Sequence, residues 1–325
     1  KDCYEKAAYY AGIIMGRNPD VSYGTYRLLS FDELWKKSGF DESEHMFSVR
    51  TRSADEEYGN GVHQWYCGMQ DAGGVLQKGP WVGNRFHWYC LFDNEDYRIT
   101  KGVKHRFQYD SQVKNGRGYY YPGTPEYKLM ATGKNMDDVK VQEPVAPFND
   151  GLTYTNSISS NCLAFTTKYA DVTDPTIGRT DAYWPFLRYA DIVLIYAEAQ
   201  CELNDGISQD AIDALNDIRI RSNAKEASVT GDGAIETKVE LRSVIFEERA
   251  KELAYEGDRR WDLLRWGIYL DVMNSLGGIN EDGTRTPYDE GSINKRREFR
   301  HLLYPLPSLE VSTNMAIDKN NPGWN

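Results

Sequence analysis

The stretch that decides the fold runs from residue 186 to residue 267, opening with FLRYADIVLIYAEA (186–199) and closing with RWDLLRWG (260–267). Apolar residues recur along it at intervals of three and four, which is the spacing of an amphipathic helix. Charged residues occupy some positions that the same spacing would bury. The stretch therefore predicts long packed helices whose inner faces carry charge.

The first helix of this stretch is predicted over 188–203, where the apolar stripe widens until it covers almost the whole circumference. Asn204-Asp205-Gly206 ends it, because glycine readily adopts the left-handed conformation found after a helix. Ser208 is a good N-cap residue and begins a partner helix. The short break between the two predicts an antiparallel hairpin of the tetratricopeptide-like kind.

Two further helices follow a polar loop. A third helix is expected over 236–256, ended by Gly257, and a fourth is expected after Asp258. The fourth has one apolar stripe, formed by Trp261, Leu264, Ile268 and Val272. The tail over 300–325 is expected to be extended, because it is rich in proline.

Before this stretch, residues 2–15 predict another helix, Ser30-x-x-Glu33 predicts a capping box, and 44–50 alternates like a strand. Periodicity then disappears over 52–185, which glycine and proline punctuate. An irregular segment of this length is typical of a functional region. The expected fold is mainly α, an α/α superhelix with tetratricopeptide-like hairpins and a loop-rich region with a few short strands. Its three sections are 1–51, 52–185 and 186–325.

Composition excludes several classes of protein. The net charge of −11 argues against nucleic acid as a partner, because phosphate binding relies on basic surfaces. Apolar runs are too short to span a bilayer. The histidines lack metal-ligand spacing and no calcium-loop pattern occurs, so neither a metal nor a cofactor is expected. Five cysteines are too few for a disulfide scaffold; unpaired thiols are favoured over a Cys67–Cys90 bridge.

Charges interrupt the apolar face of the third helix at Glu248, Arg249 and Glu252. Paired carboxylates serve as general acid and base in glycoside hydrolysis, which is one interpretation. The other is a network of arginine–carboxylate pairs between helices, for which the planar guanidinium is well suited. The network is favoured, because no nucleophile or pocket-forming loop lies nearby in the sequence.

Several motifs together resemble the SusD/RagB family, in that family's order and spacing. They are FLRYADIVLIYAEA (186–199), LNDIRIR (215–221), ERAKELAYEGDRRWDLLRWG (248–267), LYPLP (303–307) and NNPGW (320–324). The resemblance extends from the first helix to the last residue, as one domain. It implies that the family's N-terminal part, with its lipoprotein cysteine and first helical repeats, precedes Lys1. Cys3 lies inside the first helix and is not that cysteine.

The resemblance implies a non-enzymatic lipoprotein at the surface of the Gram-negative outer membrane, attached only through the absent N-terminal lipid anchor. Such proteins bind glycans or other nutrients and act with a SusC-like TonB-dependent transporter. The helical repeats form the scaffold, and the loop-rich region supplies the ligand site. Two other functions stay open, a protein-interaction scaffold without its own ligand and, less favoured, a glycoside hydrolase.

Aromatic residues gather among glycines in the loop-rich region. Their ring faces can stack on the C–H faces of sugars, while neighbouring polar groups bind hydroxyls. Any single aromatic residue is better explained as part of a small core, but several together are expected at the surface. The ligand-binding candidates are Trp65, Tyr66, Trp81, Asn84, Arg85, Trp88, Tyr89 and Tyr120.

Overall fold

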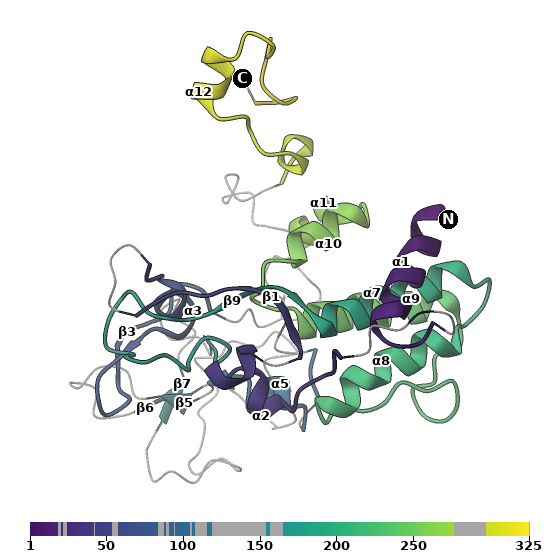
Figure 1. The fold of residues 1–325 in the computed structure, drawn as a ribbon, viewed down its shortest axis with the longest axis horizontal. Helices are drawn as coiled ribbons and strands as arrows, with labels where there is room; N and C mark the ends of the chain where they lie inside the picture. Colours follow the sequence, from purple (N-terminus) through teal and green to yellow (C-terminus); the bar gives the residue numbers. More distant parts are fainter. Residues whose placement is uncertain are drawn as a thin grey trace. The chain divides into compact units, whose positions relative to one another are not determined.

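The computed structural model contains two compact units, Lys1–Lys128 with Met136–Glu256, and Leu129–Asn135 with Gly257–Asn325 (Figure 1). The division of the chain at 51 and 185 stays a prediction. The residues that the structure describes are 1–18, 21, 25–41, 43–53, 58–83, 88, 91–93, 95–104, 106–107, 116–118, 154–156, 165–275 and 297–324.

Helix α7 (Tyr189–Leu203) is the centre of the first unit. It packs against α1 (Asp2–Ile14), α8 (Gln209–Arg221) and α9 (Lys238–Glu252), so it has neighbours on several sides. This explains why its sequence is apolar around most of its circumference. The predicted hairpin of α7 and α8 is confirmed. The core between these helices includes Ala11, Leu194, Ala197, Ile212, Leu215, Ile218, Leu241 and Ile245.

Side-chain caps fix where two of these helices begin. The Ser208 hydroxyl accepts a hydrogen bond from the Ala211 amide at 3.3 Å, and Thr237 and Glu240 form a complete capping box. The predicted end of the third helix is wrong, because α9 stops at Glu252. Tyr255 has a positive φ of 69°, which a helix cannot contain. The chain therefore leaves the helical path before Glu256.

Strand β1 (His45–Val49), which the alternation of 44–50 predicted, pairs antiparallel with β9 (Trp184–Arg188). The register places His45 opposite Arg188, and β9 leads directly into α7. The other strands are shorter: β2 (Met69–Gln70) with β3 (Leu76–Lys78), β4 (Val103–Lys104) with β8 (Phe165–Thr166), and β5 (Arg106–Phe107), β6 (Gly116–Gly118) and β7 (Tyr154–Asn156) in one sheet. The expected mainly helical fold with a few short strands is confirmed.

Short helical segments connect these strands. They are α2 (Phe31–Leu34), η1 (Lys37–Asp41), α3 (Val62–Cys67) and α5 (Tyr97–Thr100). Ser30 is the N-cap of α2, but the predicted capping box does not form. The Ser30 hydroxyl donates to the Glu33 carboxylate at 2.6 Å and makes no capping bond to the backbone.

The second unit contains α10 (Arg259–Arg265), α11 (Tyr269–Ser275), η4 (Phe299–Leu302) and α12 (Ser308–Thr313). Two expectations for this part were wrong. The fourth helix is divided in two at Gly267, which has a φ of 72°, and Trp261 is exposed while Leu263 is buried. The tail is not simply extended, because it includes η4 and α12.

Cys67 carries a free thiol, so the alternative of a Cys67–Cys90 bridge is excluded. The thiol donates to the Thr166 carbonyl oxygen at 3.2 Å, and burial raises its pKa to about 12. The unpaired thiol was the favoured prediction. Among the helices of the described residues, none has both the length and the apolar character that crossing a membrane requires.

Candidate functional site

Trp65 and Trp81 carry exposed indoles, and their main chains lie side by side. Trp65 belongs to α3 and is 44% exposed, while Trp81 follows β3 and is 74% exposed. The main-chain amides of Trp81 and Val82 both donate to the carbonyl oxygen of Trp65, each at 2.9 Å. The two exposed side chains therefore project from adjoining backbone, and we call this part of the protein the tryptophan surface.

The backbone around α3 explains how this surface is held. Asn60 accepts a hydrogen bond from the Val62 amide at 3.0 Å at the start of the helix. A Cβ atom on Gly61 would lie 2.9 Å from Cε2 of Trp65, so the indole rests against backbone that has no side chain. Gly68 ends α3 with a φ of 76°, which allows the chain to turn into β2.

The β2–β3 hairpin then returns the chain to α3. The Asp71 carboxylate accepts hydrogen bonds from the amides of Gly73 and Val75 at 2.8 and 2.9 Å, which stabilises the turn. Asp71 is therefore engaged in local structure. Gln64 remains beside Trp65 on α3, and its Oε1 lies against Gly178.

Tyr66 and Trp88 belong to an aromatic cluster inside the first unit. The Tyr66 ring lies 5.3 Å from that of Tyr169, and the Trp88 ring lies 5.5 Å from that of Tyr255. The Trp88 indole nitrogen also donates to the Ala250 carbonyl oxygen at 2.7 Å. These two rings pack inside the protein, which agrees with the alternative interpretation that a single aromatic residue of this region belongs to a small core.

The remaining candidates, Asn84, Arg85, Tyr89 and Tyr120, lie outside the described residues. Trp65 and Trp81 are therefore the two candidates that the described structure brings together at the surface. Their role in binding is a prediction that the structure leaves untested.

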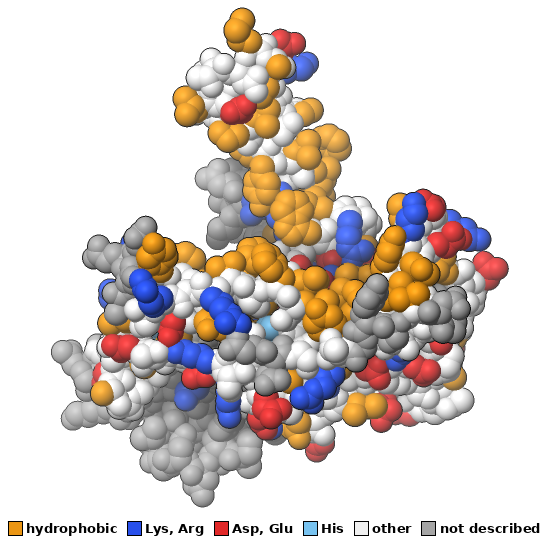
Figure 2. Space-filling view, in the orientation of Figure 1, with side chains coloured by type: hydrophobic (Ala, Val, Ile, Leu, Met, Phe, Trp, Pro, Cys, Tyr) orange, Lys and Arg blue, Asp and Glu red, His pale blue; other side chains and the backbone are white. Residues whose placement is uncertain are grey.

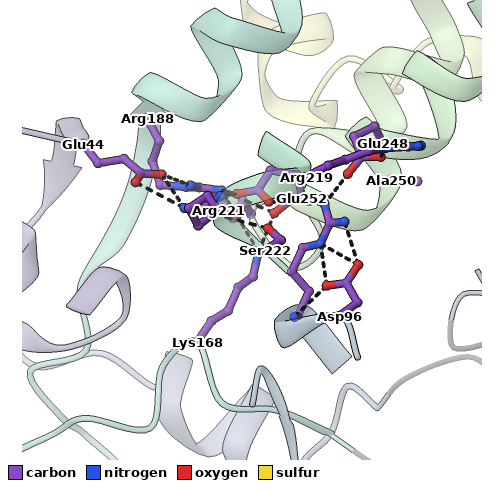
Figure 3. A network of polar contacts seen from close by, with 12 residues as sticks. Glu44, Asp96, Lys168, Arg188, Arg219, Arg221, Ser222, Glu248, Ala250 and Glu252 are labelled. Carbon is purple, nitrogen blue, oxygen red and sulfur yellow. Dashed lines mark hydrogen bonds and ion pairs between the residues drawn. The ribbon is translucent and has the colours of Figure 1, made fainter. Parts of the chain in front are cut away.

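Helix α9 carries the charges that first suggested a catalytic pair. Glu248 and Glu252 are both buried (Figure 3). Glu248 accepts hydrogen bonds from Arg98 and, at 2.8 Å, from Arg219. Glu252 is bound by Arg221 and, at 3.2 Å, by Arg188.

The network continues beyond α9 and balances its charges. Glu44, which immediately precedes β1, accepts a hydrogen bond from Arg188 at 2.7 Å, and Lys168 donates to Glu256 at 2.6 Å. Five carboxylates face five basic groups in this ionic network: Glu44, Asp96, Glu248, Glu252 and Glu256 with Arg98, Lys168, Arg188, Arg219 and Arg221. Each charge is thereby compensated within the protein interior.

The protonation of these groups argues against general acid catalysis. Burial alone would raise the pKa of Glu252, but the positive charges of Arg221 and Arg188 outweigh burial and hold the pKa well below its usual value. Burial is likewise outweighed at Glu248, whose pKa is lowered chiefly by Arg98. A glycosidase acid needs a raised pKa and access to substrate. These carboxylates have neither, so the predicted arginine–carboxylate network is confirmed.

Sequence reasoning missed several members of the ionic network. Asp96 and Arg98 come from the irregular region, and Lys168 follows β8. No periodic pattern surrounds them, so no signal in the sequence connects them with α9. Within the described part of the chain, no cluster of histidine, cysteine, aspartate or glutamate is arranged to hold a metal ion.

Paired helices packed around α7, together with an irregular region that displays the tryptophan surface, define a mainly helical scaffold joined to a loop-rich region. The comparison with protein families specifies this class. Residues 70–324 match the model described as the SusD family, and the chain belongs to that family.

Curated relatives match the chain over part of its length. SusD-like protein P2 of Formosa agariphila is 33% identical over 142 residues, which is 42% of this chain and 25% of the relative. SusD-like protein P38 of the same organism is 36% identical, also over 142 residues and with the same coverage. The matched segment is thus about a quarter of the length of these relatives.

Solved structures match the fold over nearly the whole chain. A SusD homologue from Bacteroides thetaiotaomicron has a TM-score of 0.62 and 19% identity, covering 99% of this chain and 59% of its own. Surface glycan-binding protein A of the same organism, in complex with laminarihexaose, has a TM-score of 0.58 and 19% identity, with 98% and 60% covered. At these identities the likeness concerns the fold.

Proposed function

We propose that this protein binds glycans at the cell surface without cleaving them, and that Trp65 and Trp81 contact the ligand. The observation that carries the proposal is the exposure of both indoles on adjoining backbone. Neighbouring exposed aromatic residues are typical of recognition surfaces, and their ring faces suit the C–H faces of a sugar ring.

Family membership supports the cellular setting of the proposal. A SusD-family protein is expected at the outer membrane, attached by an N-terminal lipid, where it delivers oligosaccharides or polysaccharides to a SusC-like TonB-dependent transporter. One solved protein with this fold is named as a surface glycan-binding protein in complex with laminarihexaose. Laminarihexaose is therefore a reasonable first probe for this chain.

Calorimetry with laminarihexaose, and affinity electrophoresis in gels containing laminarin, starch or xylan, would test the proposal. At least one of these glycans should bind, and Trp81→Ala and Trp65→Ala should each weaken binding by roughly tenfold or more, as loss of a stacking ring implies. Tyr10→Ala is the matched control, because Tyr10 is an aromatic side chain on α1 that is 62% exposed. Unchanged binding in both tryptophan variants would exclude the tryptophan surface as the site.

The absence of turnover needs its own measurement. Incubation with the bound polysaccharide should release no reducing ends, because the buried carboxylates of α9 are closed to substrate and ionised. Release that disappears in Glu252→Gln, with the circular dichroism spectrum intact, would contradict the non-enzymatic assignment.

An exposed apolar surface favours a protein partner as a second function. Phe47 of β1 and Phe186 of β9 are 62% and 59% exposed, and their ring centroids lie 5.7 Å apart. Figure 2 shows hydrophobic side chains gathered over β1 and β9 and beside α1. Capture of the transporter combined with no binding across the glycan panel would favour a scaffold without its own ligand.

A further inference from the structure

A pocket with a volume of about 600 Å³ lies in the first unit, apart from the tryptophan surface. The segment that leads into α2, helix α5, the first residue of α7 and the end of α8 form its wall. The Tyr97 amide donates to the Ser222 carbonyl oxygen at 2.8 Å and so joins α5 to the end of α8. The volume lies within the range of about 300–1,000 Å³ that is common for small-molecule sites.

Three tyrosines give this pocket its aromatic wall. The rings of Tyr26 and Tyr189 are nearly parallel, with an interplanar angle of 18° and centroids 6.5 Å apart. The ring of Tyr97 is covered on one side by the Lys101 ammonium group, 4.0 Å from its centroid. Among the described residues, none forms a hydrogen bond with these three phenol hydroxyls, each of which is chemically able to donate to or accept from a ligand.

Among the described residues, Arg27 is a cation of this pocket without an ion-pair partner. Lys101 forms a salt bridge with Asp32 at 2.7 Å, and Arg221 forms salt bridges with Glu44 and Glu252 of the ionic network. Arg27 lines the pocket, is exposed, and forms no ion pair with any residue in the described part of the chain. Its guanidinium group is therefore free to bind an anion.

Asp217 of α8 also lines the pocket and adds an acceptor. Its Oδ2 binds Arg17 at 2.7 Å, while its Oδ1 accepts no hydrogen bond from a described residue. A ligand that interacts with the tyrosines, Asp217 and Arg27 together therefore has three properties. It has a ring face for the tyrosines, hydroxyl groups that donate to Asp217, and one acidic group for Arg27.

We propose that this pocket binds a short acidic saccharide, with its carboxylate on Arg27 and a sugar ring on the Tyr26–Tyr189 wall. A simple anion would leave the aromatic wall unused, and a neutral sugar would leave the Arg27 charge unused. The site is independent of the proposed glycan binding at Trp65 and Trp81, since neither residue lines this pocket.

Calorimetry of the 325-residue chain at low ionic strength would test the site with three probes: digalacturonate, the neutral galactobiose and inorganic sulfate. Digalacturonate should bind roughly tenfold more tightly than galactobiose, the factor expected for one charge-assisted hydrogen bond. Added salt should reduce this preference. No heat with digalacturonate, equal affinity for galactobiose, or equal affinity for sulfate would each overturn the proposal.

Variants locate the bound probe. Arg27→Gln should remove the preference for digalacturonate over galactobiose, because it removes the charge. Tyr26→Ala should weaken the binding of both sugars, because it removes a ring and leaves the charge. Tyr10→Ala should leave both affinities unchanged, because Tyr10 is an exposed residue of α1 that lines neither the pocket nor the tryptophan surface. If Trp81→Ala abolishes digalacturonate binding and Arg27→Gln does not, the saccharide occupies the tryptophan surface and the pocket assignment is wrong.

Discussion

Arg188 forms a bidentate salt bridge with Glu256. Its Nε donates to Oε2 at 2.7 Å, and its Nη2 donates to Oε1 at 2.8 Å. The pair joins the last residue of β9 to the turn after α9. The same guanidinium also binds Glu44 and Glu252, so a single side chain connects three carboxylates. This bidentate geometry is specific to arginine.

Replacement of Arg188 by methionine should greatly destabilise the protein. The change leaves buried carboxylates without their partner, which costs about 3–5 kcal/mol of the free energy of unfolding. Urea unfolding followed by circular dichroism measures the loss. Arg242→Met is the matched control, because Arg242 pairs with Glu202 near solvent and should contribute about 1 kcal/mol or less. Equal losses in the two variants would contradict the importance of the ionic network.

Stability should fall steeply in acid. The pKa of Glu252 is lowered in the folded state, while the unfolded carboxyl titrates near its ordinary value of 4.5. A depressed pKa contributes stability that is fully present above the unfolded value and is lost as the pH falls toward the folded one. Urea midpoints measured between pH 7 and pH 3 should therefore drop below about pH 4.5. A flat profile there would show that the network does not stabilise the fold.

His45 should add a milder dependence at higher pH. Burial lowers its pKa from 6.5 to about 4, so the folded state holds the neutral ring. As the pH falls from 6.5 to 4, the unfolded chain binds a proton that the folded chain does not, and stability decreases by up to about 3 kcal/mol. In His45→Gln this slope should become shallower but not vanish, because burial also lowers the pKa of His63, and the steeper loss below pH 4.5 should remain. An unchanged slope in the variant would assign it to another group.

Gly68 should be required for the native geometry of the turn that positions the tryptophan surface. Its φ of 76° disfavours other residues, and a Cβ atom would lie 2.6 Å from the Lys78 carbonyl oxygen. Gly68→Ala should therefore cost about 1–3 kcal/mol and weaken glycan binding, because β3 leads to Trp81. Gly206→Ala is the control, since its Cβ would meet no atom within 4 Å. A neutral Gly68→Ala in both assays would refute this account of the turn.

Trp88 and Trp81 should behave in opposite ways. Trp88→Ala removes ring packing and the hydrogen bond to Ala250, and we expect a loss of about 2 kcal/mol or more. Trp81→Ala should change the unfolding free energy by no more than about 0.5 kcal/mol, because the indole is largely exposed. Thermal unfolding distinguishes the two. A stability loss in Trp81→Ala as large as that in Trp88→Ala would mean that its effect on binding reports on folding.

Much of the helical scaffold was predictable because its signals are local. The apolar circumference of α7 and the Ser208 cap follow from spacing and side-chain chemistry alone. The helix ends where predicted, at Leu203, but the expected left-handed conformation of Gly206 is wrong, because Gly206 has no positive φ and Asn204 is extended. The end of α9 was not predictable, because Tyr255 adopts a positive φ that its sequence does not favour. The break at Gly267 was misjudged for a related reason, since an apolar stripe continued across it.

The sequence by itself determined the helices, the family and the fact that Glu248 and Glu252 lie on a buried face. Tertiary structure alone decided which charges meet them, because Asp96, Arg98 and Lys168 come from segments without periodicity. It also separated the aromatic residues, since exposure depends on neighbours that are distant in the chain. Trp81 and Trp88 are seven residues apart in the same irregular region, yet Trp88 packs against Phe92 and Tyr255 while Trp81 is 74% exposed.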